Sequence, residues 1–272
     1  MDLRESVPTA LEAAALGDHQ GSLLGHVALD LATPRAAGSW MTSQPQTIDL
    51  GFVNAYLLAI EDGFILVDTG MRNQRARLEK ALAMAGCTPG RLRLIVATHG
   101  DIDHTANCAY LRTEFRAPVA MHAGDASMVE QADWPKRKVT SSSLRLMHTI
   151  MRLTGVTRRM GAGFERFTPD FELVEGQSLE SHGLAATVLH IPGHTPGSVA
   201  LALADGGLIC GDTVENRGGL HPTRIVDDEA QLHASLERLL ALDLGTVHPG
   251  HGSPFSWEQF RPAYERHRRT EA

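Results

Sequence analysis

Ten consecutive residues concentrate side chains that are able to bind a cation. They read Thr98-His99-Gly100-Asp101-Ile102-Asp103-His104-Thr105-Ala106-Asn107. Imidazole and carboxylate groups are the ligands that Zn²⁺, Mn²⁺ and iron take from proteins. Because buried carboxylates need a cationic partner or a metal, this cluster indicates a metal site. A solvated acidic loop with incidental histidines is the alternative, and the histidines farther along the chain weigh against it.

The elements around this stretch are expected to place it at the end of a buried strand. The apolar run 92–97, with β-branched Ile95 and Val96, predicts that strand. Asp68 follows another predicted strand, and we expect it to cap its turn near the site, with direct metal ligation as the alternative. Further polar turns at strand ends are 192–197 with His194, 211–213 with Asp212, and 248–252 with His251.

Strand and helix patterns alternate along the chain from residue 48 onward. A hairpin is predicted from 52–60 and 64–67 around a Glu-Asp-Gly turn. Alternation of this kind points to a layered arrangement of helices and sheets. The other predicted strands are 118–121, 171–174, 185–191, 199–203 and 208–210, and the predicted helices are 73–85, 106–115, 123–131, 141–159, 229–242 and 257–268.

Composition argues against several classes of protein. The chain has 272 residues and a formal net charge of -7, which argues against a general nucleic-acid binder. No apolar stretch approaches the length of a membrane span, and the N-terminus shows no secretory signal. Three scattered cysteines, Cys87, Cys108 and Cys210, suggest a reducing compartment. We therefore expect a cytoplasmic protein.

The sequence divides into an N-terminal extension and one main domain. Residues 1–40 match no compact element, and we expect them to be loose or docked on the domain. The domain spans 41–272 and includes a basic helical insertion at about 134–168. This insertion has eight Lys or Arg side chains against one acid.

Three interpretations of the insertion stay open. Arg145, Arg152 and Arg159 are seven residues apart, so they lie near one face of the predicted helix. The helix is interpreted as a surface helix packed by its apolar stripe, as a lid that attracts an anionic or acyl substrate, or as a membrane-surface contact.

The ordered motifs resemble those of the metallo-β-lactamase superfamily over about residues 48–255. The resemblance implies an α+β fold, a four-layer αβ/βα sandwich with two sheets face to face and helices outside. It also implies one or two metal ions at one edge of the sheets. Two Zn²⁺ ions are expected, with Mn²⁺ or iron as alternatives. The motifs are Asp68-Thr69-Gly70, His99 to His104, His194, Gly211-Asp212-Thr213 and Pro249-Gly250-His251-Gly252.

The resemblance also assigns ligands residue by residue. It implies that His99 and His194 bind the first metal, that Asp103, His104 and His251 bind the second, and that Asp212 bridges both. Asp101 stands where the superfamily usually has a histidine. As a ligand it would favour Mn²⁺ or iron and could weaken the first site, and as an alternative it is a partner of a ligand. His248 is expected to be structural.

A metal here predicts hydrolysis by activated water, with Asp103 and Asp212 as the catalytic carboxylates that orient it. The insertion favours a small ester, lactone or thioester with an anionic or acyl part. The lack of a long C-terminal helical segment counts against a standard glyoxalase II. Alternatives are a phosphodiesterase, an iron-dependent oxidoreductase of the flavodiiron or persulfide dioxygenase kind, and a binding protein that kept the fold.

Overall fold

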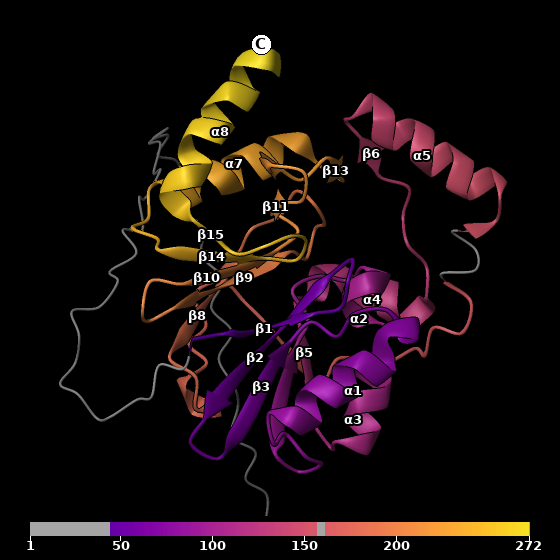
Figure 1. Ribbon diagram of the computed structural model, residues 1–272, viewed down its shortest axis with the longest axis vertical. Coiled ribbons are helices and arrows are strands. Elements are labelled where there is room, and N and C mark those ends of the chain that lie inside the picture. Colours follow the sequence, from indigo (N-terminus) through magenta and orange to yellow (C-terminus); the bar gives the residue numbers. More distant parts are fainter. Residues whose placement is uncertain (1–43, 157–160, 272) are drawn as a thin grey trace, which may run out of the picture. The chain divides into compact units, whose positions relative to one another are not determined.

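Two mixed sheets form the centre of the computed structural model, which describes residues 44–156 and 161–271. The first sheet has the strand order β1-β2-β3-β4-β5-β7, and the second has β15-β14-β10-β9-β8 (Figure 1). The predicted extension at 1–40 and Arg159 lie outside the described residues. The strands of the first sheet are Gln46–Asp49, Asn54–Ile60, Gly63–Val67, Leu92–Val96, Val119–Met121 and Phe171–Glu172; those of the second are Phe255–Ser256, Thr246–Pro249, Leu208–Gly211, Val199–Leu203 and Ala186–His190.

The pairing of strands decides which polar turns share a sheet edge. Strand β3 runs parallel to β4, so the residues that follow both strands, including Asp68 and His99, leave the first sheet at the same edge. Strand β10 runs parallel to β14, which places Asp212 and His251 at one edge of the second sheet. The predicted hairpin is confirmed, since β2 pairs with β3 in antiparallel register.

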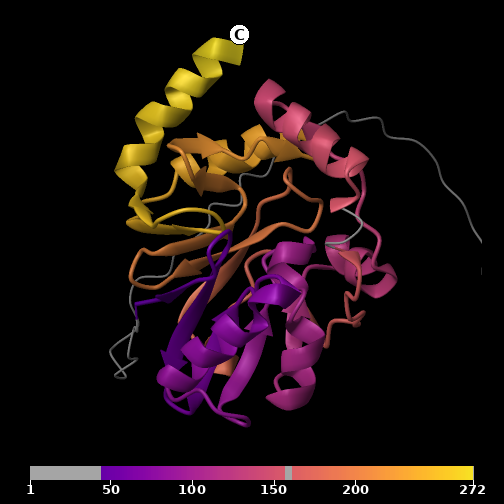
Figure 2. The ribbon, with the colours of Figure 1, turned by 45° about the vertical axis from the view of Figure 1, so that its right-hand side comes forward.

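Helices cover the outer face of each sheet, as Figures 1 and 2 show. Leu78 of α1 and Leu111 of α3 are buried against the first sheet. Leu236 of α7 and Phe260 of α8 are buried against the second. The helices are α1 Arg75–Met84, α2 Ile102–Thr105, α3 Cys108–Glu114, α4 Ala123–Gln131, α5 Ser142–Leu153, α7 Glu229–Leu240 and α8 Trp257–Glu271, with 3-10 turns at Arg72–Gln74 and Glu180–His182.

The apolar side chains between the sheets form a third core. Leu58, Ile65 and Val96 come from the first sheet, and Val188 and Leu201 come from the second. The predicted αβ/βα sandwich is therefore confirmed: two sheets pack face to face, and helices lie outside them. None of the described helices has the length and apolarity needed to cross a bilayer.

Two small sheets were not predicted from the sequence. The first pairs β11 (Val214–Asn216) with β12 (Leu220–Pro222), and the second pairs β13 (Ile225–Val226) with β6 (Lys138–Val139). The second of these joins the start of the insertion to the segment before α7, and it lies beside the site described below.

Helix α5 is shorter than predicted, and part of its apolar stripe is exposed. It ends at Leu153, and Gly155 follows with a φ of 72°. Met147 of the predicted stripe is 45% exposed and Ile150 beside it is 51% exposed, whereas Leu144 is half-buried. The packed-surface-helix interpretation is therefore wrong at Met147 and Ile150.

Candidate metal centre

All seven side chains predicted as metal ligands come together in the structure. They leave the facing edges of the two sheets, so residues far apart in the chain meet at one place. Their potential ligand atoms form three overlapping groups, within each of which all atoms lie within 4.8 Å of one another: His99, His104 and Asp212; His99, Asp101 and His194; and Asp103, His104 and His251.

His99, Asp101 and His194 form what we call the Asp101 side of the centre. Asp101 Oδ2 lies 3.0 Å from His194 Nε2 and 3.5 Å from His99 Nε2. His99 follows β4, Asp101 precedes α2, and His194 follows β8. Two separate loops, one between β4 and α2 and one between β8 and β9, therefore supply one carboxylate oxygen and two imidazole nitrogens that face one another.

Asp103, His104 and His251 form the Asp103 side. Asp103 Oδ2 lies 3.5 Å from His251 Nε2 and 4.0 Å from His104 Nε2. The His104 side chain is fully buried, whereas 16% of the Asp103 side chain is exposed. Asp103 is therefore a carboxylate of this side that solvent can reach.

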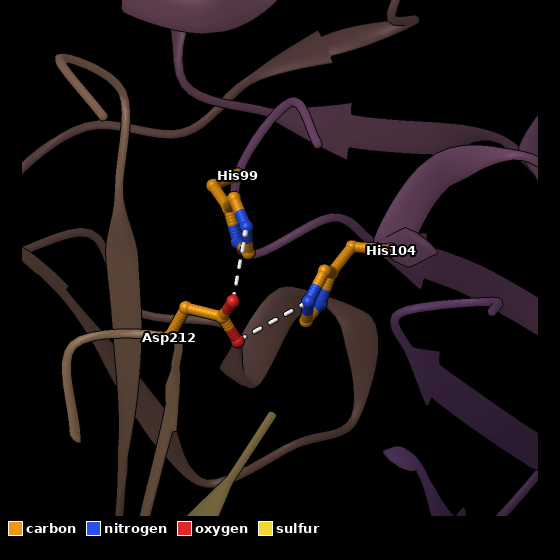
Figure 3. A group of neighbouring side chains, drawn as sticks. All are labelled: His99, His104 and Asp212. Atoms are coloured by element: carbon orange, nitrogen blue, oxygen red, sulfur yellow. Dashed lines mark ion pairs between the residues drawn. The ribbon is translucent and has the colours of Figure 1, made fainter. Parts of the chain in front are cut away.

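Asp212 links the two sides through both of its oxygens. Its Oδ1 lies 3.2 Å from His104 Nε2, and its Oδ2 lies 3.1 Å from His251 Nε2. The same Oδ2 is 3.7 Å from His194 Nε2 and 4.0 Å from His99 Nε2. Figure 3 shows the Asp212 carboxylate pointing between His99 and His104. This is the position that a carboxylate bridging two ions needs.

The Nδ1 atoms of the four imidazoles are all bound outside the centre. His194 Nδ1 donates to the Ile225 carbonyl at 2.6 Å, and His251 Nδ1 donates to the Phe52 carbonyl at 2.7 Å. A carbonyl only accepts, so Nδ1 carries a proton, and in the neutral imidazole the Nε2 lone pair points inward. Such outer bonds fix the tautomer and the orientation of metal-binding histidines.

Asp68 performs this role for the other two imidazoles. Its Oδ2 accepts from His104 Nδ1 at 2.8 Å and from the Thr98 hydroxyl at 2.8 Å. Because the Thr98 hydroxyl donates to Asp68, it accepts from His99 Nδ1, 3.0 Å away. The structure thus places Asp68 behind the ligands, as the turn-capping interpretation predicted, and not among them.

Asp125 of α4 is a second buried carboxylate that holds ligand loops, and sequence reasoning missed it. Its Oδ2 accepts from the Gly100 amide and the Thr195 hydroxyl, both at 2.7 Å, and its Oδ1 accepts from the Gly197 amide at 2.7 Å. Gly100 adjoins two residues of the Asp101 side, and Thr195 adjoins His194. Asp125 therefore fixes the two loops of that side to each other.

Gly250 leaves the space that Asp212 and His104 occupy. A Cβ at this position would come within 2.2 Å of Asp212 Oδ1 and 2.7 Å of His104 Cε1. Any side chain here would displace the shared carboxylate, so the centre requires glycine.

The charges of the centre shift the pKa values of its groups. Burial would raise the pKa of Asp212, but His251 and His104 outweigh it and hold that pKa well below its usual range. Burial would lower the pKa of His251, but Asp212 and Asp103 raise it to about 9. The same carboxylates, with Asp68, raise the pKa of His104 despite its burial. These imidazoles thus hold protons that a divalent cation would replace.

The donor set fits a divalent metal. His99 Nε2, His104 Nε2 and Asp212 Oδ1 are buried and have no hydrogen-bond partner within the described part of the chain. A tetrahedral ion with ligands at about 2.1 Å separates neighbouring ligand atoms by roughly 3.4 Å. The ion-pair distances within the centre run from 3.0 to 4.0 Å and bracket that value.

Arg137 is a further residue of the site that sequence reasoning did not assign. Its Nη1 donates to Asp101 Oδ2, and its side chain is only 7% exposed. The sequence placed Arg137 in the basic insertion but gave no sign of its partner, which is 36 positions earlier.

The remaining histidines of the predicted strands and loops lie outside the centre. His248 is 4% exposed and packs edge-on against Tyr56 at 5.3 Å between ring centroids, which agrees with the structural role predicted for it. His122 and His190 stack on each other at 4.0 Å. His221 lies in β12, where its Nε2 is 2.8 Å from an Arg224 nitrogen.

Comparisons with known proteins agree with this architecture. A hydroxyacylglutathione hydrolase from Anaeromyxobacter dehalogenans is 32% identical over 198 residues, which are 72% of this chain and 60% of that protein. The chain spans 60% or less of the length of the first curated relatives that it matches.

Solved structures share the fold. A metallo-beta-lactamase family protein from Thermus thermophilus, TTHA1429, superposes with a TM-score of 0.64 at 22% identity, covering 83% of this chain and 79% of that one. TTHA1623, whose crystal structure is of a di-iron-bound form, gives a TM-score of 0.55 at 29% identity and covers 78% of this chain and 94% of its own. The model of the metallo-beta-lactamase superfamily matches residues 48–251, and the chain belongs to that superfamily.

Proposed function

We propose that the protein is a metal-dependent hydrolase that cleaves a small thioester, ester or lactone. The observation that carries this proposal is the convergence of four imidazole Nε2 atoms and two further carboxylates around Asp212. We propose the following ligands: His99, Asp101 and His194 on one side, Asp103, His104 and His251 on the other, and Asp212 between them.

A divalent cation supplies Lewis acidity, which activates water at neutral pH and polarises a carbonyl group. Asp212 holds the two sides at a fixed separation. Asp103, whose side chain is 16% exposed, would face incoming substrate, accept a proton from the attacking water at its carboxylate, and return that proton to the leaving group as the leaving group departs. Asp103 and Asp212 are the catalytic carboxylates of this proposal.

The rim of the centre supports a substrate with an acyl part and an anionic part. Phe52 is 48% exposed and packs edge-on against His251 at 4.7 Å between ring centroids. The guanidinium carbon of Arg217 lies 4.4 Å from the centroid of the Phe52 ring. An apolar surface and a cation therefore adjoin the Asp103 side. The similarity to hydroxyacylglutathione hydrolases favours a thioester among the three substrate classes.

Arg145 contributes to the rim only if α5 acts as a lid. Its side chain is exposed, and its Nη2 donates to the Thr140 carbonyl at 3.2 Å. The lid interpretation therefore stays a prediction.

Zinc is the ion we propose, with iron or Mn²⁺ as the alternatives. The Asp101 oxygen makes the donor set harder than an all-histidine site, and TTHA1623 was crystallised in a di-iron-bound form. Iron would open the oxidoreductase alternative. A cytoplasmic location is part of the proposal, supported by three free thiols, at Cys87, Cys108 and Cys210. No nucleic-acid partner is proposed.

The test is hydrolysis of matched substrates by zinc-loaded, manganese-loaded and iron-loaded protein. A hydroxyacyl glutathione thioester, the corresponding oxygen ester, a lactone and an aryl phosphodiester are compared. We expect thioester cleavage that Asp103→Asn reduces by about 100-fold or more, and that the exposed-site control Glu61→Gln leaves unchanged. Cleavage of the phosphodiester alone would replace this proposal with the phosphodiesterase alternative, and no hydrolysis in any metal form would refute it.

A further inference from the structure

The Asp101 carboxylate is already paired with a cation of the protein itself. Arg137 Nη1 donates to Asp101 Oδ2, the oxygen that also faces His194 Nε2 at 3.0 Å and His99 Nε2 at 3.5 Å. Asp101 would bind a metal ion through Oδ2, and that oxygen already accepts a hydrogen bond from the Arg137 guanidinium. Arg137 and the attraction of the two imidazoles hold the pKa of Asp101 well below its usual range, although burial alone would raise it.

The start of the insertion holds Arg137 firmly in this place. Trp134 Nε1 donates to the Gly100 carbonyl at 2.8 Å, and Val139 pairs with Ile225 across the small sheet. Arg137 Nε lies 3.3 Å from Asp227 Oδ2, and Arg137 Nη2 lies 3.8 Å from Met128 Sδ. Contacts from both ends of the segment 134–139 thus fix a buried guanidinium against Asp101.

The Asp103 carboxylate differs in its partners. Within the described part of the chain, the ion pairs of Asp103 are with His104 and His251 alone. A divalent ion that binds at the Asp103 side therefore replaces the protons of two imidazoles and gains a carboxylate that no arginine or lysine of the described residues pairs with. An ion that binds at the Asp101 side must share its carboxylate with Arg137 and is repelled by the guanidinium charge.

The presence of Asp101 in place of a histidine also changes the charge of the centre. Asp101 adds one negative charge to those of Asp103 and Asp212, and Arg137 adds one positive charge beside it. The pair is thus neutral as a unit. It gives the Asp101 side an oxygen ligand without the increase in cation affinity that a free carboxylate would bring.

We propose that Arg137 sets the metal affinity of the Asp101 side, so that the Asp103 side fills first and the Asp101 side fills second and more weakly. The proposal rests on the metal centre proposed above. Arg137 acts here as a positioning residue, because it works through Asp101 and does not itself bind the ion.

The experiment is equilibrium dialysis of metal-free protein against buffers of defined free Zn²⁺, with bound zinc measured by mass spectrometry. It is run on the wild type, Arg137→Met and Arg137→Lys. The control is Lys138→Met, which removes a neighbouring cation whose side chain is 63% exposed and pairs with Glu229 instead. Circular dichroism confirms that each variant is folded.

For the wild type we expect two unequal binding steps. Arg137→Met is expected to tighten the weaker step by about tenfold or more, since the repulsion and the competition for Oδ2 are removed. Arg137→Lys is expected to tighten it less, because lysine keeps the charge but not the fork of donors. Lys138→Met is expected to leave both steps unchanged. Asp101→Asn is expected to abolish the weaker step only.

A weaker step that is unchanged or loosened in folded Arg137→Met would show that Arg137 is merely structural and would overturn the proposal. If Arg137→Met does not fold, an unchanged weaker step in Arg137→Lys overturns it in the same way. Loss of the tighter step in Asp101→Asn would contradict the filling order. Two equal steps in the wild type would refute this inference but not the hydrolase, whereas no zinc binding at all would refute the proposed function.

Discussion

The two sides of the centre have similar donor atoms but different supports. The Asp103 side is held by the main sandwich: His104 is bound by Asp68 at the end of β3, and His251 is bound by the Phe52 carbonyl. The Asp101 side is held partly by the insertion and the segment paired with it, through Arg137 and the Ile225 carbonyl. The first support comes from residues at the ends of the sheets, and the second comes in part from the segments 134–139 and 225–226.

This difference shows that the two sides of one metal centre can be held in place by different parts of the chain. Ligands supported by the sheets keep their geometry as long as the sandwich is folded. Ligands supported by the predicted insertion depend on a segment that contributes few side chains to the three buried cores. We therefore expect the Asp101 side to be the part of the centre that substitutions tune.

The largest effect is expected from Asp212, which belongs to both sides. Asp212→Asn removes the charge that lies 3.2 Å from His104 Nε2 and 3.1 Å from His251 Nε2. We expect both zinc-binding steps to weaken by about 100-fold or more, since a shared anionic ligand is lost. Chelator competition with a zinc-sensitive dye measures both steps. Weakening of one step alone would contradict the bridging position.

Variants of the two supporting carboxylates, Asp68 and Asp125, should change the zinc affinities of the two sides to different extents. In Asp68→Asn the amide nitrogen would face the His104 Nδ1 proton or the Thr98 hydroxyl, so the imidazole loses its inward tautomer. We expect the tighter step to weaken by about 10- to 100-fold, and the weaker step to weaken less, because Asp68 reaches His99 only through the Thr98 hydroxyl.

The matching variant is Asp125→Asn, whose amide would face the donors of Gly100, Thr195 and Gly197. We expect it to weaken the second step by about tenfold and to leave the tighter step nearly unchanged. The same zinc competition assay tests both variants, and equal effects on both steps would remove the distinction between the two supports.

The pH dependence of zinc binding should sharpen the comparison further. His251 has its pKa raised to about 9, so it is protonated at neutral pH in the metal-free protein and must lose that proton to bind zinc. We expect zinc affinity at the Asp103 side to rise by about tenfold per pH unit or more below that pKa, because His104, whose pKa is also raised, must lose its proton too, and to rise less steeply above it. Competition assays across a series of buffers from neutral pH upward measure the slope, and a pH-independent affinity would contradict the assignment of His251.

The smallest effect is expected from the exposed face of α5. Leu146→Gln combined with Ile150→Gln alters side chains that are 63% and 51% exposed. We expect the free energy of unfolding to change by about 0.5 kcal/mol or less, and zinc binding to stay the same on both sides. By contrast, Leu236→Ala in α7 removes a fully buried side chain and should cost about 2–5 kcal/mol. A change in the zinc affinity of the weaker step in the α5 variant would mean that α5, and not only the segment 134–139, influences the metal centre.

The fold and the ligand set were predictable for different reasons. Buried strands and amphipathic helices have local patterns, so β4 and α4 were found with nearly correct bounds. The seven candidate ligands follow from ordered motifs, and the structure brings them together, while their binding of metal stays a prediction. Arg137 and Asp125 could not be paired from the sequence, because their partners lie 36 and 25 positions away and carry no local signal.

The shortest strands also could not be predicted from the sequence. Strands β6 and β13 have two residues each, and they pair across 86 positions of the chain, so neither strand has a local pattern that reveals the other. The exposure of Met147 and Ile150 in α5 was missed for a related reason: the stripe has helical periodicity, but periodicity does not show whether a partner surface is present.

Anomalous diffraction at the zinc edge, from crystals equilibrated at low and then high free Zn²⁺, would test the central claim most directly. We predict one peak at low zinc between Asp103, His104, His251 and Asp212, and a second peak at high zinc between His99, Asp101, His194 and Asp212. A first peak at the Asp101 side would contradict the unequal supports described above. No peak among these seven residues at any zinc concentration would contradict the metal centre itself.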